Sequence, residues 1–255
     1  MKRLRVEKTI LFAIAVNIPL IFFGYGTDVD TYRVLEIGRT FLATGDYVPS
    51  RHPGFVIHEM MTLILDTLGG SLLTNLGTLA MSIIGIHSFI RLCQHYKLAN
   101  SQLLTIIFII HPLFWINSTN TIDYVWAIGF VLSGFYLLIK YRFSSAGLAF
   151  GLAIGSRFTS FIAVVIILIF IYITVVEYRK KILLAAIITG LITALCNILP
   201  FDFTGWELRI LEPSIGNPIH WTPVLRYGRF VYKNIYFWGL IPSLFLLFLS
   251  IPIIR

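Results

Sequence analysis

The sequence predicts an all-α integral membrane protein, a polytopic helical bundle of about eight transmembrane segments, with amphipathic juxtamembrane helices in its first outer loop. Of its 255 residues, 57% are hydrophobic and only 13% are charged. The mean hydropathy is +0.85. This composition excludes an ordinary soluble domain, in which about a quarter of the residues are charged.

The charged residues are distributed unevenly between alternate loops, and this asymmetry predicts the orientation. With the N-terminus in the cytoplasm, 12 of the 20 Lys and Arg residues lie inside, and ten of the 12 Asp and Glu residues lie outside. We therefore expect both termini in the cytoplasm and place the protein in a prokaryotic plasma membrane. The net charge of +8 then belongs to inner loops, so no nucleic-acid partner is expected. Cys93 and Cys196 indicate neither a disulfide framework nor a zinc site.

Apolar runs separated by charged or turn-forming residues define the predicted spans, for which about 17–25 residues are usual. The fifth run is short, so the fifth and sixth can also form one kinked hairpin that turns at Arg157. His111-Pro112 predicts a kink in the third run. The predicted spans are residues 9–25, 71–90, 102–116, 122–139, 145–156, 158–176, 182–199 and 235–251.

Two long outer loops, 26–70 and 200–234, form the polar face of a single membrane domain, 1–255. In the first loop, residues 31–44 have helical apolar spacing that suits a helix lying on the membrane. Asp30 or Thr31 suits the N-cap of this helix, and Gly45 suits its C-terminal end.

A second surface helix is predicted at 53–68, with His58, Glu59 and Asp66 as its polar residues. His58 is expected to be structural, as most isolated histidines near an interface are. His111 is also expected to be structural, at a kink.

Acidic residues beside the membrane are the first candidates for chemistry, because charge placed there is costly unless it is used. Asp28 and Asp30 follow the first span, where a carboxylate can act as a general base or bind a metal. Helix capping is the alternative, and it explains one of the two. Asp123 begins the fourth span. A cap or a solvated turn is the simpler interpretation of Asp123, and contact with the first loop is the other.

Basic and aromatic residues on the same side suit an anionic, sugar-bearing ligand. Arg157 ends a short segment rich in glycine, which is built to pack closely and present a cation that holds a phosphate. Snorkelling to lipid headgroups is the alternative for Arg157. Arg226 and Arg229 form a second basic patch, and Trp221 can stack on a sugar face.

The order of motifs in the first loop resembles a known superfamily. An Asp-rich start is followed by Glu36-Ile-Gly-Arg39, then by Ala43-Thr-Gly-Asp-Tyr-Val-Pro49, and then by His52-Pro53. This order is similar to that in the polytopic GT-C type glycosyltransferases, which use polyprenyl-phosphate sugars, and above all to the protein O-mannosyltransferases and aminoarabinose transferases. Asp123 and the segment Gly151-Leu-Ala-Ile-Gly-Ser-Arg157 match two later features of that superfamily. The resemblance covers about the first 180 residues.

The resemblance implies a membrane transferase that moves a sugar from a polyprenyl phosphate to an acceptor hydroxyl on the outer face, with inversion. It makes the first-loop Asp the general base. Counting back from Glu36 selects Asp30, and an alternative alignment selects Asp28. Arg157, His52, Arg226, Arg229 and Trp221 would bind the lipid phosphate or the sugar. Asp123 would orient the acceptor, which is a lipid, a glycan or a protein, or hold a divalent metal together with Asp30.

Three differences and two alternative functions belong with this hypothesis. Pro53-Gly54 replaces the usual two prolines of the family. Family members are usually longer, and they often carry a C-terminal soluble domain. A short member or a C-terminally truncated one is therefore expected. A membrane transporter is the first alternative, although the predicted spans carry almost no charge at their centres and show no inverted repeat. The second alternative function is that of a non-catalytic membrane assembly protein.

Overall fold

The computed structural model describes residues 6–45, 47–51, 55–198, 201–202 and 207–208. All of them belong to one compact unit, Met1–Glu212, and the second unit, Pro213–Arg255, lies outside the described residues. The predicted eighth span and most of the second outer loop therefore lie outside as well. So do the candidate residues His52, Trp221, Arg226 and Arg229.

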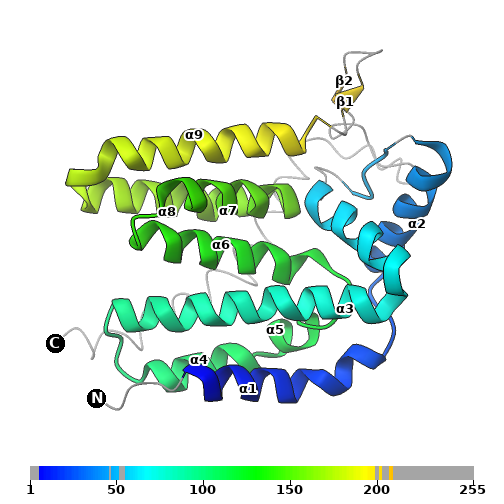
Figure 1. Cartoon of the computed structure of the whole chain (residues 1–255), viewed down its shortest axis with the longest axis horizontal. Helices are drawn as coiled ribbons and strands as arrows, with labels where there is room; N and C mark the ends of the chain where they lie inside the picture. The colour runs from blue at the N-terminus through cyan, green and yellow to red at the C-terminus, as the bar shows by residue number, and fades with distance from the viewer. Residues whose placement is uncertain (1–5, 46, 52–54, 199–200, 203–206, 209–255) are drawn as a thin grey trace, which may run out of the picture. The chain divides into compact units, whose positions relative to one another are not determined.

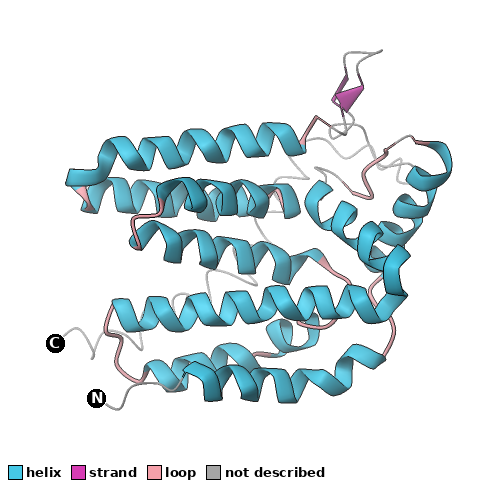
Figure 2. Ribbon diagram, viewed as in Figure 1, coloured by secondary structure: helices cyan, strands magenta, loops and turns pink. Residues whose placement is uncertain are grey.

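The described residues are almost entirely helical, which confirms the all-α class (Figure 2). The one exception is a short antiparallel pair of strands, β1 and β2, with two residues in each strand. The elements in order are α1 (Val6–Asn17), η1 (Ile18–Phe22), α2 (Val29–Thr44), α3 (Val56–His95), α4 (Ser101–Ile110), α5 (Pro112–Asn117), α6 (Asp123–Ile139), α7 (Phe143–Ser156), α8 (Ser160–Thr174), η2 (Val176–Tyr178), α9 (Arg179–Cys196), β1 (Phe201–Asp202) and β2 (Glu207–Leu208).

The long helices form a layered bundle in which each helix packs on the next (Figure 1). α9 contacts α7, α7 contacts α6, α6 contacts α3, and α3 contacts α1 and α4. The main buried cluster includes Leu138, Phe150 and Ile182, so the core lies where α6, α7 and α9 meet. α2 packs on the first part of α3 and lies at the right-hand end of the bundle in Figure 1.

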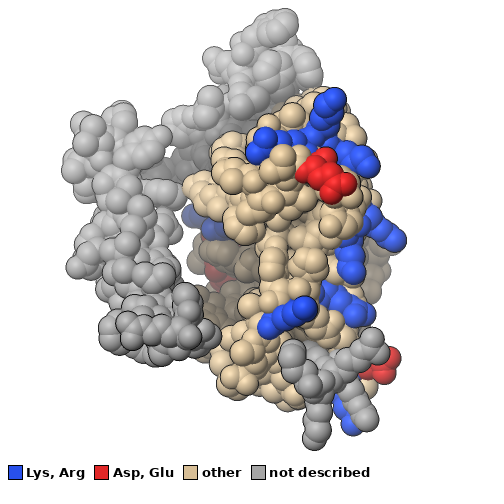
Figure 3. All heavy atoms as spheres, turned by 90° about the vertical axis from the view of Figure 1, so that its left-hand side faces the viewer, with Lys and Arg blue, Asp and Glu red and all other residues tan. Residues whose placement is uncertain are grey.

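The predicted inner and outer loops lie at opposite ends of this bundle. The ends of α3 and α6 and the starts of α4, α7 and α9 lie on the left in Figure 1. These are the turns that the charge pattern assigns to the cytoplasm. Figure 3 views this end, where Lys and Arg side chains outnumber Asp and Glu on the described surface. α2 and the starts of α3 and α6 lie at the other end.

The first surface helix forms as predicted, but its cap differs. α2 covers residues 29–44, and Gly45 ends it in the left-handed conformation at φ 73°. The predicted N-cap, Asp30 or Thr31, is wrong, because Asp28 occupies that position and its carboxylate accepts a hydrogen bond from the backbone N–H of Asp30. The carboxylate of Asp30 is therefore left for another partner.

The second surface helix forms the beginning of α3 rather than a separate element. A break at Gly69 and Gly70 divides α3, and Gly70 has a φ of 58° that favours glycine. This helix begins at Val56, after the predicted start at residue 53. His58 and Glu59 are buried, at 1% and 0% exposure, so the prediction that they form its polar surface is wrong. His58 packs against Trp126 of α6, and Glu59 accepts hydrogen bonds from Tyr47 and Ser50 in the preceding loop.

The short helix α7 packs against α9 through glycines spaced four residues apart. A Cβ atom at Gly147 would lie 2.6 Å from the carbonyl oxygen of Ala185, and one at Gly151 would lie 2.5 Å from Cβ of Ile192. A Cβ atom at Gly155 would lie 2.8 Å from Sγ of Cys196. The glycines therefore allow the two backbones to approach closely. Both cysteines are buried and free.

The breaks between helices confirm one prediction and leave another untested. α4 ends and α5 begins at His111-Pro112, where a kink was predicted. Among the described helices, only α3 is by itself long and apolar enough to cross a membrane. α8 and α9, which meet at an angle of 110°, provide a second if they form one bent span. α4, α6 and α7 are apolar but shorter, and the eight spans stay a prediction.

The outer faces of α8 and α9 are apolar. In a water-soluble protein, the outward face of a surface helix is polar. On α8, Ile162, Ile166 and Ile173 are each about 60% exposed, with a spacing of four and seven residues. On α9, Ile187 and Leu191 are 60% and 59% exposed. Contiguous apolar stripes of this kind mark a surface that contacts lipid or another protein.

The α7–α9 contact predicts opposite effects for two Gly-to-Ala substitutions. Gly151→Ala is expected to destabilise the protein by about 1–3 kcal/mol, because the added methyl group overlaps Ile192. Gly190→Ala on α9 is the matched control, because no atom lies within 4 Å of its added Cβ. It is expected to be neutral or to stabilise by up to about 1 kcal/mol. Thermal unfolding in detergent measures both, and equal effects would contradict the close packing.

Candidate functional site

A chain of ion pairs links the first outer loop to α6 and α7. Arg51 donates from Nη1 to Oδ2 of Asp30 at 2.5 Å and from Nη2 to Oδ1 of Asp123 at 2.7 Å. Arg157 donates from Nη1 to Oδ2 of Asp123 at 2.5 Å. We call Asp30, Arg51, Asp123 and Arg157 the ion-pair chain. Arg33 adds a longer contact of 3.3 Å to Asp30 at its exposed end.

Burial differs steeply along the ion-pair chain. The side chain of Asp123 is 0% exposed, that of Arg51 is 16% exposed, and those of Asp30 and Arg157 are 25% exposed. Burial opposes the charge of Arg51, but the carboxylates of Asp123 and Asp30 outweigh it and raise the pKa of Arg51. The site therefore has a buried anionic centre, two arginines around it and a more exposed carboxylate at its edge.

Asp123 plays neither of the simpler roles that the sequence favours. Ile122, not Asp123, occupies the N-cap position of α6, and Asp123 lies in the first turn. Its complete burial also excludes a solvated turn. Its two oxygen atoms each accept a hydrogen bond from a different arginine. The alternative interpretation, in which Asp123 faces the first loop, agrees with the structure.

Each of the two arginines stacks its guanidinium group on an aromatic ring. The guanidinium of Arg51 lies 4.2 Å from the ring centroid of Phe55, and that of Arg157 lies 4.1 Å from the ring of Tyr124. Arg157 also donates from Nε to the hydroxyl of Thr159 at 3.1 Å. Stacking of this kind fixes the plane of a guanidinium and leaves its other N–H groups free to bind anions.

Backbone and hydroxyl contacts fix α2 against the turn before α6. Thr31 donates from its hydroxyl to the carbonyl oxygen of Thr121 at 2.9 Å, and the N–H of Thr121 donates to the carbonyl of Tyr25 at 3.1 Å. Gly26 has a φ of 103° beside Asn120, where a side chain would be strained and crowded. These contacts set the distance between Asp30 and Asp123.

A buried acid anchors the segment that carries Arg51. Glu59 accepts hydrogen bonds from the hydroxyls of Tyr47 and Ser50, and from the N–H of Ser50 at 3.1 Å. Burial and the neighbouring Glu59 raise the pKa of Tyr47, so the phenol keeps its proton and remains a donor. Residues 47–51 are thereby tied to α3, and Arg51 is directed toward Asp123.

Three buried polar atoms around this site lack a hydrogen-bond partner among the described residues. They are Nε of Arg51, Nδ1 of His58 and Oγ of Ser156, the residue before Arg157. Buried polar atoms are normally hydrogen-bonded to protein or to ordered water. The site therefore keeps unused capacity to bind water or a polar ligand.

The positions of Asp30 and Asp123 do not fit a divalent metal bound between their two carboxylates, which was one prediction from the sequence. The guanidinium of Arg51 lies between the two carboxylates and bonds to both. No group of three or more His, Cys, Asp or Glu side chains suited to a metal occurs in the described part of the chain. A cation is thus already supplied by the protein itself.

The sequence-based candidates fall into three groups. The structure brings Asp30, Asp123 and Arg157 into one ion-pair chain. It uses Asp28 to cap α2. It does not describe His52, Trp221, Arg226 or Arg229.

Arg51 was missed by the sequence analysis. A signal for it existed, because Arg51 is a cation in a loop with an excess of acids that is predicted to lie beside the membrane, and such a charge needs a partner.

Comparison with known proteins found no matching family model, no similar curated protein and no similar solved structure.

The burial gradient predicts that two charge deletions differ strongly in effect. Asp123→Asn is expected to destabilise the protein by about 3 kcal/mol, since it leaves two partly buried arginines without their counter-charge. Arg33→Gln removes an exposed pair and is expected to cost less than about 1 kcal/mol. Reversible unfolding in mixed micelles measures both. A loss below about 1 kcal/mol for Asp123→Asn would show that the buried carboxylate does not organise the site.

Proposed function

We propose that this protein is a membrane glycosyltransferase that moves a sugar from a polyprenyl-phosphate donor to an acceptor hydroxyl on the outer face of a prokaryotic plasma membrane. The observation that carries the proposal is the ion-pair chain. It holds a partly exposed carboxylate, Asp30, beside two oriented arginines, Arg51 and Arg157, at one end of an apolar helix bundle. A lipid-linked phosphate sugar needs such a pair of sites, one basic and one acidic.

The apolar surface of the bundle supports the membrane placement. The exposed stripes of Ile and Leu on α8 and α9 suit contact with acyl chains rather than with water. α6, with 17 residues, is about 25 Å long, close to the hydrocarbon thickness of about 30 Å. The proposed topology has eight spans, with the basic end of the bundle in the cytoplasm and the ion-pair chain outside.

The two arginines are proposed to bind the donor phosphate. Each is held by Asp123 and by an aromatic ring, and each retains N–H donors that no described residue occupies. Asp123 is completely buried, so it does not reach a substrate and acts as a positioning residue for the arginines. This replaces the earlier expectation that Asp123 orients the acceptor.

Asp30 is proposed as the general base. Its competitor Asp28 uses its carboxylate to cap α2, whereas the carboxylate of Asp30 is partly exposed and pairs with Arg51. In the reaction, the acceptor hydroxyl gives its proton to Asp30 while its oxygen forms a bond to the anomeric carbon. The bond from that carbon to the phosphate oxygen breaks, and the electron pair leaves on the lipid phosphate, which the arginines stabilise. A single displacement inverts the anomeric centre.

Arg51 links donor binding to the base in this mechanism. In the structure, it donates to Oδ2 of Asp30 at 2.5 Å, so this oxygen atom is occupied. A donor phosphate that draws Arg51 toward itself weakens this pair and releases Asp30 for proton transfer. The acceptor is a lipid, a glycan or a protein, and the donor sugar is a hexose or a pentose.

The base assignment predicts the effect of Asp30→Asn. Release of polyprenyl phosphate from radiolabelled polyprenyl-phosphate sugars is expected to fall at least about 100-fold, since the proton acceptor is lost. Glu36→Gln is the matched control, because Glu36 is an exposed acid on the same helix. It is expected to keep full activity. Unchanged transfer in both Asp30→Asn and Asp28→Asn, with normal folding, would sink the mechanism.

The role of Arg51 predicts a specific defect for Arg51→Lys. A lysine keeps the charge but cannot bond in the same fork geometry to both Asp30 and Asp123. The transfer rate is expected to fall about tenfold to 100-fold, with a raised KM for the donor. Arg33→Lys, at the exposed pair, is expected to change little. Equal kinetics for the two variants would show that the bridge is not used.

A further inference from the structure

A cavity lies at the opposite end of the bundle from the ion-pair chain. Its volume is about 200 Å³, and its walls come from the end of α3, the end of α6, the last turns of α8 and the first turn of α9. Asp123 and Ile139 are the first and last residues of α6, and Ile139 lines this cavity. The two sites are therefore separated by the length of that helix, about 25 Å.

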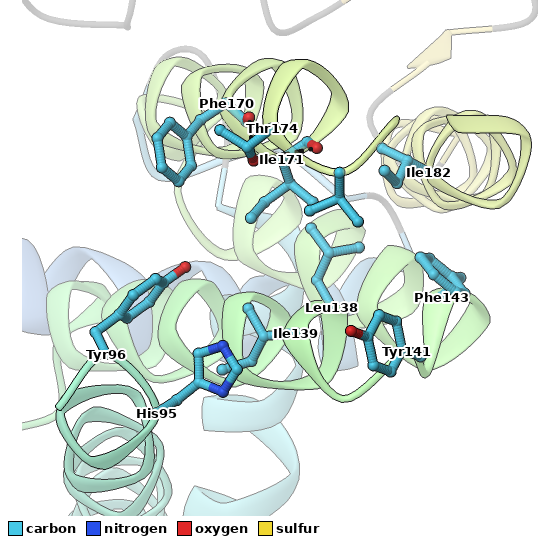
Figure 4. A pocket seen from close by; sticks show the side chains of 11 residues that line it. His95, Tyr96, Leu138, Ile139, Tyr141, Phe143, Phe170, Ile171, Thr174 and Ile182 are labelled. Atoms are coloured by element: carbon cyan, nitrogen blue, oxygen red, sulfur yellow. Dashed lines mark hydrogen bonds between the residues drawn. The ribbon is translucent and has the colours of Figure 1, made fainter. Parts of the chain in front are cut away.

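The lining of this cavity is apolar at its centre and carries polar atoms at its edge (Figure 4). Leu138, Ile139 and Ile171 lie at its centre, and they are at most 8% exposed. Tyr96 and Tyr141 lie at its edge and are 42% and 58% exposed. An amphipathic ligand with an apolar part inside and a polar part outside would match this arrangement.

The volume limits what the cavity can hold. An apolar cavity of about 150 Å³ holds one benzene molecule, and pockets for whole small-molecule ligands measure about 300–1,000 Å³. At about 200 Å³, the cavity accepts a short hydrocarbon segment but not a complete nucleotide or cofactor. The rest of the ligand must therefore lie outside, over the exposed edge.

Cations without ion-pair partners lie close to the lining residues in the sequence or in space. Lys140 and Arg142 are the sequence neighbours of the lining residue Tyr141, and both are exposed. Nζ of Lys181 lies 6.0 Å from the ring of Phe143, which also lines the cavity. In the described part of the chain, the ion pairs involve only Arg33, Arg51 and Arg157 at the other end. Figure 3 views this end and shows its Lys and Arg side chains at the surface. An anionic headgroup is the matching ligand chemistry.

We propose that this cavity is a binding site for an anionic phospholipid of the inner leaflet. A segment of one acyl chain fills the apolar centre, and the phosphate lies against Lys140, Arg142 and Lys181. The inference rests on the proposed membrane placement but not on the proposed catalysis, because it uses none of the residues of the ion-pair chain. Anionic headgroups concentrate in the cytoplasmic leaflet, where basic side chains attract them.

The test is lipid binding by the purified full chain in detergent, read by native mass spectrometry. Phosphatidylglycerol and phosphatidylcholine with the same acyl chains are titrated separately. We expect one phosphatidylglycerol to bind at least about tenfold more tightly than phosphatidylcholine, because only its headgroup carries a net negative charge. Equal binding of the two lipids would overturn the proposal. Displacement of phosphatidylglycerol by millimolar inorganic phosphate would also overturn it, because the ligand would then be a free anion.

Two variants separate the contribution of charge from that of the cavity. The triple substitution Lys140→Gln, Arg142→Gln, Lys181→Gln is expected to weaken phosphatidylglycerol binding at least about tenfold, to the level of phosphatidylcholine, since each cation near an anionic headgroup contributes up to about fivefold. It should leave phosphatidylcholine binding unchanged. Thr174→Phe, which places a ring at the exposed edge of the cavity, is expected to weaken both lipids alike. Unchanged binding in either variant would contradict the site.

Matched controls keep this test distinct from the test of catalysis. Arg39→Gln removes an exposed cation from α2, at the opposite end, and should leave lipid binding unchanged. Asp30→Asn should also leave it unchanged, even if transfer is lost. Preferential phosphatidylglycerol binding in a protein with no transferase activity would support this site and count against the proposed function alone.

Discussion

The pairing of one buried carboxylate with two arginines is the interaction on which the described site depends. Asp123 is completely buried, and an ionised carboxylate in that position is stable only with charged partners. Its two oxygen atoms accept from Arg51 and Arg157. The first loop, the start of α6 and the end of α7 are therefore held together at one point. The tight contact of α7 with α9 and the capped α2 both serve this geometry.

Polar and apolar side chains occupy different parts of the bundle surface. Exposed Ile and Leu side chains cover the outer faces of α8 and α9, while the ion-pair chain lies at one end of the bundle. The two ends differ in a way that a composition count does not show. At one end the arginines are bound to carboxylates, and at the other the cations of the described residues have no ion-pair partner. The cations at the first end are therefore oriented by carboxylates of the protein, and those at the second end are not.

Much of this fold was predictable from the sequence, because helix-forming apolar runs and breakers are local signals. The spacing of α2, the Gly45 end and the His111-Pro112 break were all read correctly. The burial of Glu59 was not predicted from the sequence. Its hydrogen-bond partners Tyr47 and Ser50 lie in a loop without regular secondary structure, and no local pattern indicates that this loop folds onto Glu59. Arg51 was missed for the same reason. Its partners lie 21 and 72 residues away, and no periodicity links them.

The separation of these partners along the chain also orders their assembly during synthesis. Arg51 precedes Asp123 by 72 residues, whereas Arg157 follows it by 34. At a translation rate of about 5–20 residues per second, Arg157 appears about 2–7 seconds after Asp123. The nascent Asp123 therefore has Arg51 as its earliest counter-ion, and Arg157 completes the pair only when α7 has emerged. Arg51 thus gives the carboxylate of Asp123 a counter-ion during the interval in which it would otherwise have none.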